Sequence, residues 1–193
     1  MLSALEHSST PSIQWGAVIT VSLVAAVIDA RVRRIPNWLT GPVFLAGLVW
    51  AAWGSGFPGV LDAMAAAVLL ALPYVILFTI AGGGAADAKL MGALGTWLGV
   101  SNGCVVLVAV CVSGAVIGIG YAMVKGQARG VLCNIALICL GLASVIAGRR
   151  KWSEAAKFLP NPRHMLAIPY GLAAFFGVCA AAAMAYARKA GGV

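Results

Sequence analysis

The acidic residues of this chain are few enough to be considered one by one. Its 193 residues include only five Asp and Glu. Glu6 and Glu154 lie in polar segments, and Asp62 follows a Gly/Pro turn, where the helix dipole favours an acid in a first turn. Asp29 and Asp87 instead lie at the ends of strongly apolar runs. A carboxylate beside hydrocarbon is costly, which makes these two the candidates for chemistry.

Two carboxylates that meet at a membrane edge could hydrolyse a peptide bond. Because like charges in contact cannot both ionise cheaply, such a pair would share one proton. The ionised member would take a proton from water, and the protonated member would polarise the peptide carbonyl and later donate its proton. This reaction requires no metal and no cofactor, and we predict neither. The alternative for each aspartate is a salt bridge, Asp29 with Arg33 and Asp87 with Lys89 or an arginine.

Other site chemistries find little support in the sequence. The two histidines, His7 and His164, lie in polar segments, so Cys/His catalysis is not expected. The glycine run 82–84 is not followed by the Lys-Ser/Thr of a phosphate-binding loop. The five cysteines lie within apolar stretches and form no CxxC pair, so neither a zinc site nor a disulfide framework is predicted.

The composition indicates an integral membrane protein. Hydrophobic residues make up 62% of the chain and charged residues only 9%, whereas a soluble domain carries about 25% charged residues. The net charge of +8 comes from basic residues in short loops between apolar runs. This is the positive-inside pattern rather than a nucleic-acid-binding face. We therefore predict one integral membrane domain over residues 1–193, with the lipid bilayer as its partner and no cleavable signal peptide.

The apolar runs predict an all-α, polytopic bundle. A helix needs about 20 residues to cross the hydrocarbon core. The charge-free stretch from 90 to 124 is too long for one crossing, and the turn signal 101–103 divides it, as a Gly/Pro turn at 54–59 divides an earlier stretch. We expect about six membrane helices, one of them short and following the glycine-rich loop. The apolar segments are Ile13–Ile28, Trp38–Trp53, Val60–Ala81, Asp87–Val100, Cys104–Val124, Val131–Ala147 and Met165–Ala187.

The basic residues predict the orientation. Loops after the first, third and fifth helices carry Lys or Arg, and the intervening turns carry none. The basic side is expected to be cytoplasmic, which places the N-terminus outside and both Asp29 and Asp87 inside. A crossing by Val131–Ala147 would bring the basic cluster around Arg149 to the outside, so we expect this segment to lie in the interface or to re-enter.

Three motifs in order resemble those of one family. Residues 29–40 read DARVRRIPNWLT, residues 84–95 read GAADAKLMGALG, and residues 168–171 read IPYG. They are similar to the type IV prepilin peptidases, which are aspartic membrane proteases of the GxGD class. The resemblance implies that Asp29 and Asp87 form the catalytic pair. It further implies that Gly84, Ala86 and Lys89, together with Pro36 and Asn37, support the site or its substrate, the last two by ending the loop and capping the second helix.

The resemblance also implies a substrate and a location. A short basic leader would be cut from a prepilin or pseudopilin at the cytoplasmic face of a prokaryotic inner membrane, with the substrate's hydrophobic helix in the bilayer beside the site. The chain departs from the family motif at Ala86, where the family has glycine. It also lacks the paired CxxC motifs of longer members, so the resemblance is to short, peptidase-only forms without methyltransferase activity.

Two other functions are compatible with the residues alone. The aspartates could bind a cation or relay protons in a transporter, although both lie at helix ends on one side and no inverted repeat is evident. The chain could also be a non-catalytic assembly factor of a pilus or secretion machine, to which the Ala86 departure points. No oligomeric state and no particular substrate are predicted.

Overall fold

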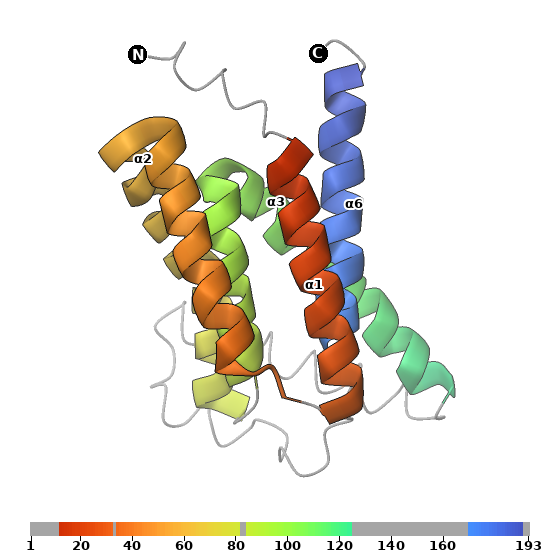
Figure 1. The fold of residues 1–193 in the computed structure, drawn as a ribbon. Helices are drawn as coiled ribbons and strands as arrows, with labels where there is room; N and C mark the ends of the chain where they lie inside the picture. Colours follow the sequence, from red (N-terminus) through yellow and green to blue (C-terminus); the bar gives the residue numbers. More distant parts are fainter. Residues whose placement is uncertain (1–11, 33, 82–83, 125–169, 191–193) are drawn as a thin grey trace, which may run out of the picture.

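A computed structural model of the chain describes residues 12–32, 34–81, 84–124 and 170–190. These residues form four helices and no strand (Figure 1). Each helix is long and apolar enough to cross a membrane, so the all-α membrane class is confirmed, but the count of about six is not. The segment Val131–Ala147 lies outside the described residues. The helices are α1 (Ser12–Val32), α2 (Asn37–Ala81), α3 (Ala85–Val124) and α6 (Tyr170–Ala190).

Both long helices contain one break, and each break is at a glycine. In α2 the break is at Gly56 (φ 62°, ψ −147°), inside the predicted 54–59 turn. In α3 it is at Gly99 (φ 67°, ψ 176°), so the turn expected at 101–103 is wrong: those residues are helical. Asp62 of α2 explains the shift, because its carboxylate accepts a hydrogen bond from the amide of Val100 (3.4 Å) and caps the helix that follows the break.

Gly99→Ala is expected to destabilise the protein by about 1–3 kcal/mol, because its backbone conformation is open essentially to glycine alone. A side chain there would also collide with the Asp62 carboxylate. The measurement is thermal unfolding in detergent micelles. Gly120→Ala in the same helix is the matched control, since a Cβ there meets nothing within 4 Å. A melting temperature for Gly99→Ala equal to that of the control would contradict this account.

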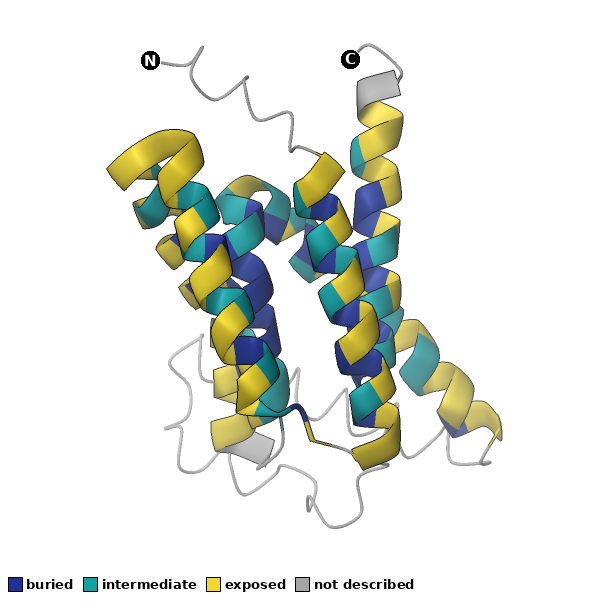
Figure 2. Ribbon diagram, viewed as in Figure 1, coloured by how far each residue is buried: buried dark blue, intermediate teal, exposed yellow. Residues whose placement is uncertain are grey.

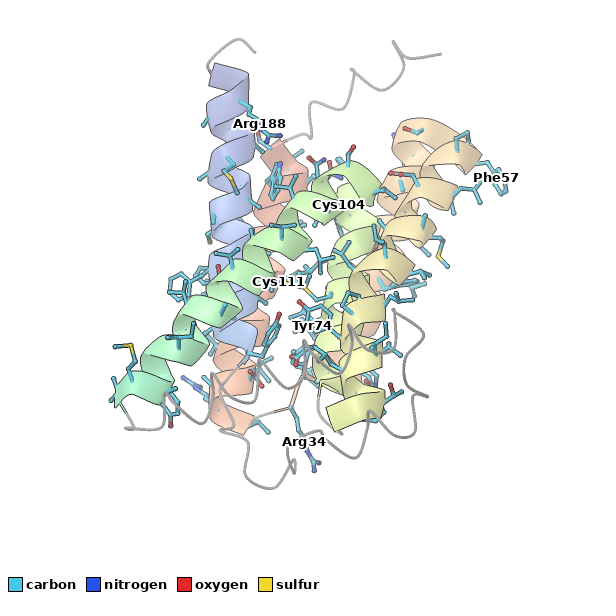
Figure 3. The ribbon with its side chains drawn as sticks, turned by 180° about the vertical axis from the view of Figure 1, so that it is seen from behind. Arg34, Phe57, Tyr74, Cys104, Cys111 and Arg188 are labelled. Carbon is cyan, nitrogen blue, oxygen red and sulfur yellow. The ribbon has the colours of Figure 1, made fainter. Side chains whose placement is uncertain are left out.

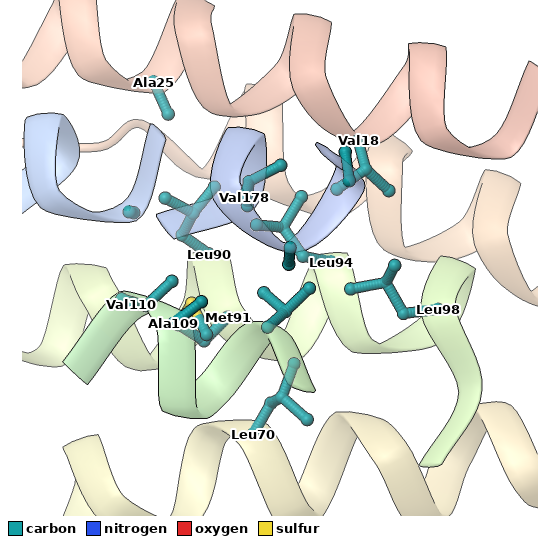
Figure 4. Close-up of a cluster of buried hydrophobic side chains, with 14 of the residues drawn as sticks. Val18, Ala25, Leu70, Leu90, Met91, Leu94, Leu98, Ala109, Val110 and Val178 are labelled. Carbon is teal, nitrogen blue, oxygen red and sulfur yellow. The ribbon is translucent and has the colours of Figure 1, made fainter. Parts of the chain in front are cut away.

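The central element of the bundle is α3. It packs against α2 on one side and α6 on the other, and α1 packs mainly against α6 (Figure 1). Its N-terminal half presents Leu90, Leu94 and Leu98 to the core at helical spacing. Figure 4 shows Leu90 and Leu94 beside Val178 of α6, and Val18 of α1 belongs to the same buried cluster. This packing sets the positions of the helices that carry the two candidate aspartates.

The outward faces of the helices are apolar. Figure 2 shows exposed residues along the outer sides of α1, α2 and α6. Among them are large hydrophobic side chains such as Trp53, Leu45 and Val68, which are more than half exposed. In water so much exposed apolar surface would drive aggregation, whereas in a bilayer lipid tails cover it. The chain is therefore a membrane protein.

Candidate active site

Asp29 lies in the last turn of α1, and α6 covers it. Its side chain is only 9% exposed. The amide of Gly171 donates a hydrogen bond to Oδ2 of Asp29 (2.9 Å). Gly171 is the second residue of α6, so this amide belongs to the first turn, where helix donors lack intrahelical acceptors. Asp29 thus acts as a capping acceptor for α6, and the helix dipole favours its negative charge.

Asp87 lies in the first turn of α3. Gly84 precedes the helix with a positive φ of 102°, and its carbonyl accepts the first helical hydrogen bond from Ala88 (2.9 Å). A Cβ on Gly84 would lie 3.9 Å from Oδ2 of Asp87. Glycine therefore allows both the turn into α3 and open space beside the carboxylate.

The two aspartates lie toward the same end of the bundle. Asp87 is within electrostatic reach of Asp29, although α1 and α3 make few direct contacts. Figure 1 shows the Val32 end of α1 and the Ala85 end of α3 at the same end of the molecule. Each carboxylate lies at a helix N-terminus, Asp29 at that of α6 and Asp87 at that of α3. This arrangement offsets part of the cost of placing two acids beside hydrocarbon.

The supporting residues predicted from the motifs cluster around the same end. The Pro36 carbonyl accepts hydrogen bonds from the amides of Leu39 (3.1 Å) and Thr40 (3.4 Å), which makes Pro36 the cap of α2. Asn37 has a different role from the expected cap: its Oδ1 accepts a hydrogen bond from Lys89 Nζ (3.0 Å). This bond joins the starts of α2 and α3. The alternative partner of Asp29, Arg33, lies outside the described residues.

The sequence assigned no functional role to two aromatic residues that lie at the site. Tyr74 of α2 is buried among the helices in the interior of the bundle (Figure 3). Its hydroxyl oxygen lies 2.5 Å from that of Tyr170, the first residue of α6. Both phenols are within electrostatic reach of Asp87. Tyr170 belongs to the IPYG motif and Tyr74 lies inside an apolar run, but the 96 positions between them give no sign that the two side chains meet.

Comparison with known proteins decides the family. A model of the type IV leader peptidase family matches residues 16–119, which include both aspartates.

The chain belongs to the type IV leader peptidase family.

A second similarity supports this membership. The prepilin leader peptidase/N-methyltransferase of Neisseria gonorrhoeae is 32% identical over 155 residues, which cover 76% of this chain and 53% of the relative. The leader peptidase family member described here thus spans about half of the length of the curated relative that it matches. No solved structure matches the chain significantly. The resemblance of the chain to this family is therefore confirmed.

Proposed function

We propose that this chain is a membrane-embedded aspartic endopeptidase that removes the leader peptide from prepilin-like or pseudopilin-like proteins at the cytoplasmic face of the membrane. One observation carries the proposal. Asp29 and Asp87 are remote in sequence and yet lie within electrostatic reach of each other. Family membership supports the same activity, as does the similarity to the gonococcal prepilin leader peptidase/N-methyltransferase.

In the proposed reaction the two carboxyl groups share one proton. The ionised carboxylate removes a proton from a water molecule, whose oxygen attacks the carbonyl carbon of the scissile peptide. The protonated carboxyl group hydrogen-bonds the carbonyl oxygen and stabilises the tetrahedral intermediate. The C–N bond then breaks, and a proton passes to the leaving amine. The products are a free leader carboxylate and a new N-terminal amine, so no other reactant is needed.

The position of Ala86 favours an intact site. Its side chain is partly buried and packs against the hydrophobic core, and we propose that it stays out of the path of the substrate. Ala86→Gly is therefore expected to change the turnover number by less than about 3-fold, while the helix loses at most about 1 kcal/mol of stability. Steady-state cleavage and thermal unfolding measure the two effects. A gain of ten-fold or more in turnover would show that the methyl group obstructs the substrate.

The direct test is leader cleavage in a defined system. The purified protein in proteoliposomes is mixed with a prepilin-like substrate, and mass spectrometry reads the N-terminus of the substrate after incubation. A mass loss equal to the basic leader supports the endopeptidase. An unprocessed substrate would instead favour a non-catalytic assembly role, and ion flux that depends on either aspartate would favour transport.

A further inference from the structure

Tyr74 and Tyr170 form a closely packed pair between α2 and α6. Their hydroxyl oxygens are 2.5 Å apart. Their rings meet edge to face, with centroids separated by 5.4 Å and planes inclined at 69°. Tyr74 is only 4% exposed. A part-buried hydrogen bond combined with an aromatic contact restricts both side chains more strongly than either interaction would alone.

Each tyrosine lies near a glycine that is close to one of the aspartates. Tyr170 directly precedes Gly171, whose amide binds Oδ2 of Asp29. On the other side, the carbonyl oxygen of Tyr74 lies 3.7 Å from the point where a Cβ on Gly84 would be. That same point is 3.9 Å from Oδ2 of Asp87. The tyrosine pair therefore connects the two parts of the chain that hold the carboxylates.

The tyrosine pair joins two helices that otherwise pack little against each other. The helices that carry the aspartates, α1 and α3, make few direct contacts; α1 rests on α6, and α3 rests on both α2 and α6. Within the described residues, α2 and α6 are not among the helix pairs that pack extensively. The Tyr74–Tyr170 hydrogen bond is thus a direct link between α2 and α6, in addition to the packing of α3 against both of these helices.

We propose that Tyr74 and Tyr170 are positioning residues that hold Asp29 and Asp87 at a fixed separation. This inference rests on the proposed function, since it assigns the tyrosines to the aspartate pair. The mutual bond uses one of the two hydroxyl protons, and the other proton is available to a third acceptor at the site. Among the described residues, Asp87 and Cys111 of α3 are the other titratable groups within electrostatic reach of both phenols.

Removing one hydroxyl tests the pair without removing a ring. Tyr74→Phe and Tyr170→Phe are each expected to lower kcat about 3- to 10-fold, the effect of one buried hydrogen bond, with KM changed less than 2-fold. Because both substitutions break the same hydrogen bond, the kcat of the double variant should be no lower than that of the slower single variant. Tyr186→Phe, at an exposed position of the same α6 helix, is the matched control and should retain the wild-type kcat.

A second measurement reads the separation directly and needs no activity. Spin labels are attached to cysteines at the exposed neighbours of the aspartates, Ala30→Cys and Ala85→Cys, in a chain whose five native cysteines are replaced by alanine. Electron paramagnetic resonance then gives the distribution of distances between the labels. The tyrosine-to-phenylalanine variants are expected to widen this distribution, and Tyr186→Phe is expected to leave it as in the parent chain.

The two measurements separate failure of the inference from failure of the proposed function. If the wild-type protein cleaves no leader, the proposed function fails, and the spin-label distances still test the tyrosine pair. An unchanged distance distribution in Tyr74→Phe and Tyr170→Phe would overturn the inference. Losses in kcat that multiply in the double variant would overturn it as well, because they would mean that the two hydroxyls act independently.

Discussion

Asp29→Asn and Asp87→Asn are each expected to abolish leader cleavage, with losses of about 10²- to 10⁴-fold in turnover, the range contributed by a general acid or base. Asparagine keeps the size of the side chain but can neither take a proton from water nor donate a carboxyl proton. At position 29 the amide oxygen can still accept the hydrogen bond from Gly171. The fold and membrane insertion should therefore survive in both variants. Cleavage in proteoliposomes, followed by mass spectrometry of the substrate, is the measurement.

Asp62→Asn is the matched control for this pair. Asp62 lies in α2, whereas Asp29 and Asp87 lie in α1 and α3. Its carboxylate accepts a hydrogen bond from the amide of Val100, which the side-chain oxygen of asparagine can also accept. The rate of leader cleavage by Asp62→Asn should stay within about 3-fold of the wild-type rate, because a single exposed polar contact contributes little to stability. Full cleavage by either Asp29→Asn or Asp87→Asn would refute the assignment of the pair.

Gly171→Ala is expected to cause the second large effect. A Cβ at this position would lie 2.9 Å from Cα of Ala26, 2.9 Å from Cβ of Asp29 and 3.2 Å from its Oδ2. The two carbon–carbon distances of 2.9 Å are shorter than packed carbon atoms tolerate, so α6 must shift away from α1. The shift would draw the Gly171 amide from the carboxylate, and a displacement of about 1 Å at a catalytic group can cost about 10²-fold in rate. Steady-state cleavage kinetics measure the loss.

The same substitution also separates crowding from helix propensity. Glycine to alanine inside a helix favours folding by about 1 kcal/mol, whereas overpacking a core costs about 1–3 kcal/mol. We therefore expect Gly171→Ala to be destabilised, or at best neutral, in thermal unfolding. Gly16→Ala in α1, where a Cβ meets nothing within 4 Å, is the control and should be unchanged or slightly stabilised. Wild-type activity in Gly171→Ala would contradict the close contact between α6 and Asp29.

Much of the fold could be predicted from local patterns. Apolar run lengths and the scarcity of charge indicate membrane helices, because bilayer thickness imposes a length on each crossing. Gly56 lies within the predicted turn, because a cluster of glycine and proline disfavours a regular helix through its own backbone preferences. The break in α3 lies at Gly99 rather than at the predicted turn 101–103. Several glycines of this stretch could adopt the conformation of the break, and a contact with Asp62, which is remote in sequence, selects among them.

The sequence by itself determined that this protein belongs in a membrane and that Asp29 and Asp87 lie at the ends of apolar runs. These properties follow from composition and from motifs whose residues are neighbours in the chain. Only the tertiary structure decided which groups surround the aspartates. The amide of Gly171 donates a hydrogen bond to Asp29, which is 142 residues away along the sequence. Tyr74 and Tyr170, whose hydroxyls are hydrogen-bonded, are 96 residues apart. Such contacts leave no periodic signal, because they depend on where packed helices cross rather than on the spacing of residues along one of them.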